Sequence, residues 1–100
     1  MERKSSERIN IRKLEKLVTV LKGVAHPVRL QLVNTLLTKE RTVGELSEFI
    51  GAKQSLTSQQ LSLLKFSGIL KSKREGNKVY YTFSNIHYKN IVASIIKELS

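Results

Sequence analysis

The sequence predicts a mainly α-helical fold with one β-hairpin, in the order ααααββα. Two observations carry this prediction. Apolar residues recur every three or four positions along most of the chain, which is typical of amphipathic helices. Near residue 76, a Gly-Asn pair separates two short runs that read as the strands of a hairpin. One hundred residues suffice for one hydrophobic core and not for two, so we expect a single domain over residues 1–100.

Composition excludes several classes of function. The chain has no cysteine, which excludes disulfides, thiolate metal sites and thiol redox switches. It also has no aspartate, and its two histidines have no acid–base or nucleophile partners in the sequence, so we do not expect an enzyme. No apolar run approaches the ~20 residues of a membrane span, and the first ten residues lack the apolar region of a secretory signal. We expect a cytoplasmic protein that binds no membrane.

The charge distribution favours a polyanionic partner. Eighteen basic and eight acidic residues give a net charge of +10. The segment from Gly51 to Arg74 contains five basic residues and no acid. Such a segment suits a phosphate backbone, because neutralised phosphates release their counterions. Charge alone leaves RNA and acidic membranes open as alternatives to double-stranded DNA.

Two helices are expected in the first forty residues. The first covers about residues 9–25, and its apolar stripe is wider than one neighbouring helix requires, so it serves either the core or a subunit interface. The second covers about residues 27–38 and begins at Pro27, whose missing N–H costs nothing at a first helical position. His26 is expected to be a boundary residue. The stripe of the first helix consists of Leu14, Leu17, Val18, Leu21, Val24 and Ala25.

A pair of helices joined by a tight turn is expected next. Thr42 and Glu45 form a capping box, which marks the start of a helix. Gly51 ends this helix, because glycine adopts the left-handed conformation without penalty. A further helix runs from about Gln54 to Gly68. The expected buried face of the first of these helices consists of Val43, Leu46, Phe49 and Ile50.

The front half of the helix that starts at Gln54 is rich in small, uncharged, polar side chains. Amides pair bidentately with adenine, and hydroxyls adapt to donors or acceptors on base edges. We therefore expect a helix-turn-helix whose second helix enters the major groove of double-stranded DNA. The alternative is an ordinary helical domain with a solubilising polar surface. The expected base-facing set is Gln54, Ser55, Ser58, Gln59 and Gln60.

A hairpin with a basic tip follows. Its turn is Gly76-Asn77, and apolar residues alternate along the second strand. A hairpin directly after a helix-turn-helix predicts a wing that reaches the DNA backbone. The alternative is a capping hairpin with solvated lysines. The expected backbone and wing contacts are Lys53, Lys65, Lys73, Arg74 and Lys78, of which Lys65 is the weakest candidate.

A last helix is expected over about residues 86–99, with a second surplus apolar stripe. Apolar surface of this extent on two terminal helices indicates an interface, and we expect a homodimer built from both helices. The expected interface residues are Leu14, Leu17, Leu21, Ile91, Ile95 and Leu99.

The chain from about Leu14 to Leu99 resembles the ArsR-type (arsenical-repressor-like) winged helix-turn-helix transcription factors. The resemblance rests on LKGVAHPVRLQLVNTLL, on VGELSEFIG followed by QSLTSQQLSLLKFSGIL, and on KREGNKVYYTF. It implies a homodimeric regulator, usually a repressor, that binds inverted-repeat operators until a metal or another signal releases it.

Departures from the family pattern concern its metal sites. Val43-Gly44-Glu45 stands where the family has Cys-x-Cys, and a second family site would retain only Asn85, His87 and Glu98. These residues make a poor zinc site, so we expect no cofactor and a resemblance to the metal-independent branch. Two alternatives stay open. One is a ligand- or metal-responsive repressor with a non-cysteine sensor near His87, and the other is a winged-helix module that binds only proteins.

The helix expected to read DNA departs from the family pattern as well. Lys53 stands where the family has a capping serine, and Gln60 where it has histidine. Lysine is a poor cap and its charge is unfavourable at the positive end of a helix. A nearby phosphate would remove that conflict, so Lys53 is expected to contact the DNA backbone. Leu56 is expected to face DNA or solvent, with Thr57 in a half-buried slot.

Overall fold

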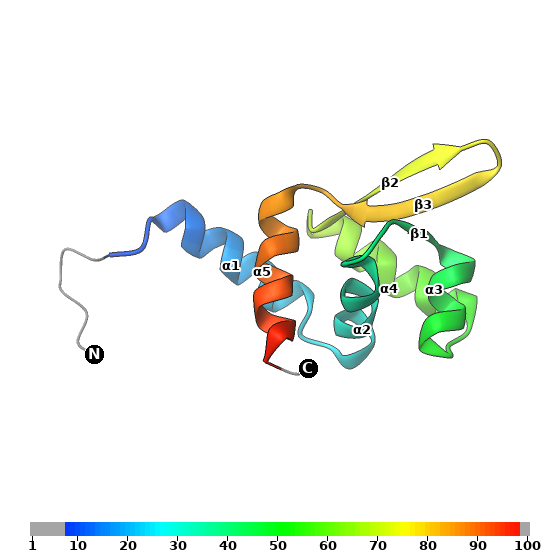
Figure 1. Cartoon of the computed structure of the whole chain (residues 1–100), viewed down its shortest axis with the longest axis horizontal. Coiled ribbons are helices and arrows are strands. Elements are labelled where there is room, and N and C mark those ends of the chain that lie inside the picture. Colours follow the sequence, from blue (N-terminus) through cyan, green and yellow to red (C-terminus); the bar gives the residue numbers. More distant parts are fainter. Residues whose placement is uncertain (1–7, 99–100) are drawn as a thin grey trace.

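The computed structural model describes residues 8–98, and in this range it contains five helices and a three-stranded antiparallel sheet (Figure 1). This architecture confirms the predicted winged helix-turn-helix. The helix-turn-helix is formed by α3 and α4, and the wing by β2 and β3. The elements are α1 (Ile11–Gly23), α2 (Pro27–Leu36), β1 (Arg41–Thr42), α3 (Val43–Ile50), α4 (Gln54–Phe66), β2 (Leu70–Glu75), β3 (Lys78–Phe83) and α5 (Ile86–Lys97).

Strand β1 is the one element that the sequence did not predict, since Lys39-Glu40-Arg41 reads as a polar connector. Arg41 pairs with Tyr81 and Thr42 with Tyr80, so β3 lies between β1 and β2. A two-residue strand has no periodicity to detect, because alternation needs at least four residues. Its effect on the fold is nevertheless direct. It joins the start of α3 to β3, the central strand of the sheet.

Local hydrogen bonds define the helix ends as predicted. Thr42 Oγ1 accepts from the Glu45 backbone N–H at 3.2 Å, and Glu45 Oε1 accepts from the Thr42 N–H at 3.0 Å, which completes the capping box. Gly51 ends α3 with a φ of 67°. His26 Nδ1 accepts from the Val28 N–H at 3.1 Å, so this histidine is a helix cap, in agreement with its expected boundary role.

All five helices and the base of the hairpin contribute to one hydrophobic core. The helix-turn-helix is anchored in it by Leu46, Leu61 and Leu64, which are fully buried. The other buried apolar side chains are Val20, Val24, Leu32, Val33, Leu36, Ile69, Leu70, Phe83 and Val92. Among the described residues, no helix is long and apolar enough to cross a bilayer.

The expectation that Phe49 lies in the core is wrong. Its side chain is 61% exposed, and the guanidinium carbon of Arg41 lies 4.2 Å from the ring centroid. The buried side of α3 includes positions 46 and 47, with 43 and 50 half-buried, so it follows the i, i+3, i+4, i+7 pattern of a helix face. Phe49 falls outside this face. A cation–π contact with Arg41 partly covers the ring.

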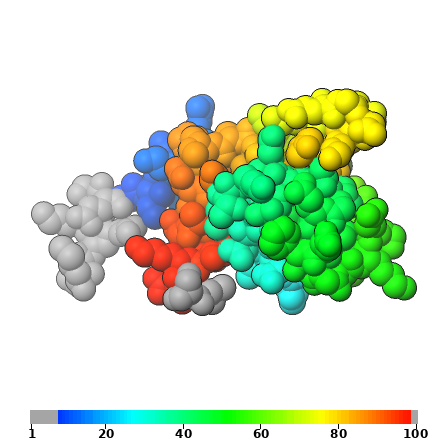
Figure 2. Space-filling view, turned by 45° about the vertical axis from the view of Figure 1, so that its right-hand side comes forward, coloured from blue at the N-terminus to red at the C-terminus, as the bar shows by residue number. Residues whose placement is uncertain are grey.

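The hairpin extends past the helices on the side of α3 and α4, and α1 extends away from them at the opposite end (Figure 1). In the space-filling view, the hairpin tip (yellow) lies above the surface formed by the helix-turn-helix (green; Figure 2). Leu70 pairs with Phe83 at the buried base of the hairpin, and Glu75 pairs with Lys78 beside the turn. The base is therefore fixed in the core, while the basic tip stands in solvent.

Candidate nucleic-acid interface

Helix α4 has a buried back and an exposed polar front. Thr57, Leu61 and Leu64 on its back are inaccessible to solvent. Four members of the expected base-facing set are exposed and lie on one face, because positions 54, 55, 58 and 59 are neighbours on a helix. We call this set the reading face, and it consists of Gln54, Ser55, Ser58 and Gln59. The core thus fixes the helix while leaving these four side chains accessible.

The fifth expected member, Gln60, does not belong to this face. It is only 8% exposed, and its Oε1 accepts a hydrogen bond of 2.9 Å from Arg29 Nη1. Position 60 lies three residues after Thr57 and four before Leu64, which places it on the buried back of α4. The expectation that Gln60 contacts bases is therefore corrected. Its amide joins α4 to α2 inside the protein.

Arg29 is the residue of this region that sequence reasoning missed. Besides Gln60, its guanidinium binds the Gly23 carbonyl, with Nε donating at 2.7 Å. A single side chain thus connects the end of α1, the first turn of α2 and the reading helix. The sequence carries one indication of this role, because Arg29 is the only charged residue between Pro27 and Leu36.

Lys53 precedes α4 and its side chain makes no capping hydrogen bond, as expected for lysine. The first N–H groups of a helix have no intrahelical acceptors, and here the residue before the helix supplies none from its side chain. The start of α4 is consequently a positive helix end next to an exposed ammonium. Leu56 is 38% exposed, as expected. Thr57 is fully buried and not half-buried as expected, because it lies on the core side of α4, where its hydroxyl donates to the Lys53 carbonyl at 3.0 Å.

The lysines of the expected backbone set differ in their surroundings. Lys73 Nζ lies 2.9 Å from Glu40 Oε2 and 3.3 Å from Glu75 Oε1, and its hydrogen bonds to these carboxylates, to Glu40 foremost, raise the pKa of the ammonium. Lys65 Nζ donates to Ser72 Oγ at 2.8 Å. Arg74 and Lys78 are exposed and form no ion pair with any residue from 8 to 98. The wing therefore offers two uncommitted cations at its tip.

Five of the six expected interface residues lie on α1 and α5, which pack side by side (Figure 1). Leu14, Leu17, Ile91 and Ile95 are half-buried, and Leu21 is 48% exposed. Leu99 lies outside the described residues. On α1, Val18 and Leu21 therefore leave apolar surface exposed, whereas Ile91 and Ile95 on α5 pack partly against the core.

Of the three residues at the position of the family's second metal site, Asn85 has a structural role. Asn85 Oδ1 accepts from the backbone N–H groups of His87 and Tyr88, at 2.9 and 3.2 Å, and so caps α5. In the part of the chain that the structure describes, no three His, Cys, Asp or Glu side chains gather in a way that would hold a metal ion.

Comparison with known proteins agrees with this geometry. Residues 26–72 match the model of the bacterial regulatory protein family named arsR. The chain is 36% identical to the biofilm growth-associated repressor of Xylella fastidiosa over 95 residues. This alignment covers 95% of this chain and 75% of that protein. It is 35% identical over 88 residues to the transcriptional activator HlyU of Vibrio cholerae, covering 84% and 82% of the two chains. The chain belongs to the ArsR family.

Comparison with solved structures shows the ArsR-type fold over most of the chain. The structure of HlyU from Vibrio cholerae N16961 superposes with a TM-score of 0.78 at 33% identity, and covers 87% of this chain and 95% of that one. This ArsR-family protein is thus a winged helix-turn-helix DNA-binding transcriptional regulator. Of these two relatives, one is named a repressor and the other an activator.

Proposed function

We propose that this protein represses transcription as a homodimer bound to an inverted-repeat operator in double-stranded DNA. The observation that carries the proposal is the reading face. Four uncharged hydrogen-bonding side chains project from a helix that the core holds by its back, in a segment without a single acid between Gly51 and Arg74. This arrangement suits insertion into the major groove, where base edges present distinct donors and acceptors.

The members of the reading face have different tasks. Gln54 and Gln59 carry amides, which pair with two atoms of an adenine. Ser55 and Ser58 carry hydroxyls, which donate or accept according to the base that they meet. Because none of the four carries a charge, they contribute to discrimination between sequences more than to overall attraction.

The backbone contacts come from the start of α4 and from the wing. A phosphate beside Lys53 would neutralise its ammonium and accept from the free N–H groups of the helix. Arg74 and Lys78 reach phosphates from the hairpin tip. Lys65 and Lys73 contribute less, because their ammonium groups already have acceptors within the protein.

Dimerisation joins two copies of this single domain through α1 and α5. Leu14, Leu17, Leu21, Ile91 and Ile95 lie on these helices, and we place Leu99 in the same interface from its sequence position. A two-fold axis between the protomers presents two reading helices to two half-sites of opposite orientation.

Regulation in this proposal uses neither a metal nor a thiol. The chain has no cysteine, and Asn85 Oδ1 is engaged by two backbone N–H groups. Operator titrations in zinc and in chelator should coincide. A tenfold separation that His87→Ala abolishes would instead support a sensor near His87.

Selection of bound duplexes from a random DNA pool tests the proposal. With the full chain, we expect an enriched inverted repeat whose half-sites lie about 10 base pairs apart, or a multiple of this distance. The Ser58→Ala/Gln59→Ala double variant should recover a more degenerate sequence. No enrichment and no shift of random duplexes would favour a protein-interaction module. A promoter carrying the recovered sequence should lose expression when the protein is present, and a gain would make it an activator.

A further inference from the structure

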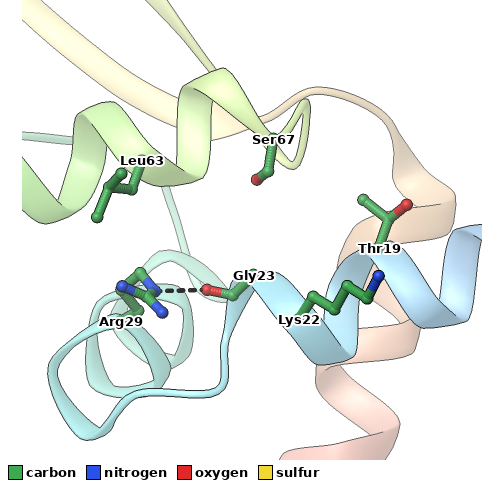
Figure 3. Close-up of a pocket in the computed structure, with 6 residues that line it drawn as sticks. All are labelled: Thr19, Lys22, Gly23, Arg29, Leu63 and Ser67. Atoms are coloured by element: carbon green, nitrogen blue, oxygen red, sulfur yellow. Dashed lines mark hydrogen bonds between the residues drawn. The ribbon is translucent and has the colours of Figure 1, made fainter.

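We propose that the hollow between α1, α2 and the end of α4 binds a small organic carboxylate through Arg29 and Lys22. The hollow measures about 400 Å³, which lies within the range of small-molecule pockets. Figure 3 shows Arg29 and Leu63 on one side and Lys22 and Thr19 on the other. Its lining residues are Thr19, Lys22, Gly23, Arg29, Leu63 and Ser67.

The guanidinium of Arg29 supplies the main argument for an anion. It has five N–H groups, of which one binds the Gly23 carbonyl and one binds Gln60 Oε1. Three remain. The side chain is half-buried, yet no carboxylate within residues 8–98 pairs with it. A charge that is partly removed from water and unpaired is unfavourable, and a bidentate carboxylate is the acceptor that fits a guanidinium best.

The remaining residues that line the hollow also favour an anion, and they indicate which chemical class of anion would bind. Lys22 adds a second positive charge, and it forms no ion pair in the described part of the chain. The lining contains no acid. The Thr19 and Ser67 hydroxyls offer further polar contacts, while Leu63, which is 47% exposed, provides an apolar wall. A carboxylate attached to an apolar group satisfies both parts of this lining.

Arg29 also gives the hollow a connection to the reading helix. A carboxylate in the hollow binds the free N–H groups of Arg29, and its charge-assisted hydrogen bonds are about twice as strong as the bond to the neutral Gln60 amide. It therefore draws the guanidinium toward the hollow and strains the bond to Gln60. Gln60 follows Gln59 of the reading face directly. Anion binding therefore weakens the support of α4 and lowers DNA affinity, and DNA lowers anion affinity by the same factor. This last step rests on the proposed DNA-binding function.

Calorimetric titration of the full chain with sodium benzoate, in a chloride buffer of constant ionic strength, tests the site without DNA. We expect saturable binding of one benzoate per chain. Lys22→Ala and Leu63→Glu should weaken it at least about tenfold, since the first removes a charge-assisted contact and the second supplies a competing carboxylate. Lys22 has no described protein partner to lose, and circular dichroism verifies that both variants fold.

Matched controls change the same charges outside the hollow. Lys13→Ala removes an exposed lysine from α1, and Phe66→Glu adds a carboxylate to α4 at a side chain that is 93% exposed. Both should bind benzoate as the unaltered protein does. Absence of saturable binding, or equal losses in hollow and control variants, would overturn the site. Binding of inorganic phosphate without benzoate would overturn the organic carboxylate class.

Operator-binding measurements with benzoate distinguish the existence of the carboxylate site from its effect on DNA affinity. At matched ionic strength, benzoate should weaken operator binding by the unaltered protein and leave Leu63→Glu unaffected. Benzoate binding in the calorimeter without any change in operator affinity would contradict the coupling. A protein that binds benzoate and never binds DNA would instead contradict the proposed function.

Discussion

At the scale of single residues, two adjacent glutamines have opposite surroundings. Gln59 is exposed on the reading face, whereas Gln60 is buried and bound to Arg29. We expect Gln59→Ala to lower affinity for the operator by about 1–3 kcal/mol, the value of one bidentate contact, and to change affinity for random DNA much less. Shift assays on both duplexes measure the difference. Equal losses on both would show that Gln59 does not read bases.

Gln60→Ala should act on folding. Its removal leaves a partly buried guanidinium without one acceptor, which costs about 1–3 kcal/mol of unfolding free energy. Urea denaturation of the two alanine variants compares them directly, with Gln59→Ala as the exposed control. A Gln60→Ala protein of unchanged stability would contradict the structural role of its amide.

Glu45 predicts a pH dependence of stability. The hydrogen bond from the Thr42 backbone N–H, followed by that from its hydroxyl, lowers the pKa of the carboxyl below its ordinary value of 4.5. A folded-state pKa below the unfolded one gives stability that is present above pH 4.5 and is lost as the pH falls through the folded pKa. Glutamine also completes a capping box and does not titrate in this range. In urea denaturation, the difference in unfolding free energy between the unaltered protein and Glu45→Gln should therefore be smaller at pH 3 than at pH 7. An equal difference at both pH values would contradict a lowered pKa of Glu45.

At the scale of elements, the wing contains two kinds of cation. Lys78 is uncommitted, so Lys78→Ala should weaken operator and random DNA alike and reduce the slope of log affinity against log salt by about one. Lys73→Ala should have a smaller effect, because Glu40 and Glu75 already pair with its ammonium. Salt titrations of the two variants provide the comparison. If Lys78→Ala altered neither affinity nor slope, the hairpin would be a structural cap.

The elements also show what the sequence can and cannot predict. Thr42, Gly51 and Gly76-Asn77 act through local chemistry, so they were sufficient to place a helix start, a helix end and a turn. The pairing of Arg41 with Tyr81, the ion pair of Glu40 with Lys73 and the bond of Arg29 to Gln60 join residues far apart in the chain. No local pattern contains these partners. The exposure of the four reading-face residues was therefore predictable, whereas the burial of Gln60 was not, because it depends on Arg29 in α2.

At the scale of the whole molecule, the proposed interface on α1 and α5 predicts the oligomeric state. Sedimentation at micromolar concentration should give about twice the chain mass of 11.4 kDa. Leu21→Glu should shift the protein toward monomer, because it places a charge in the proposed apolar interface. Phe49→Glu, an exposed site on α3, is the control and should remain dimeric. A monomeric unaltered protein would contradict both the dimer and the palindromic operator.

Gly23 has a consequence at this largest scale. A side-chain methyl group there would overlap the Cδ1 atom of Ile69, which is fully buried and has little room to move. Even alanine would therefore require either that the Ile69 side chain changes its rotamer within the core or that the end of α1 moves away from it. In the dimer proposed here, a movement of α1 would be repeated by symmetry in both halves and would change the separation of the two reading helices. Gly23, which lies outside the reading face, would thus help to set the half-site spacing that the proposed dimer binds.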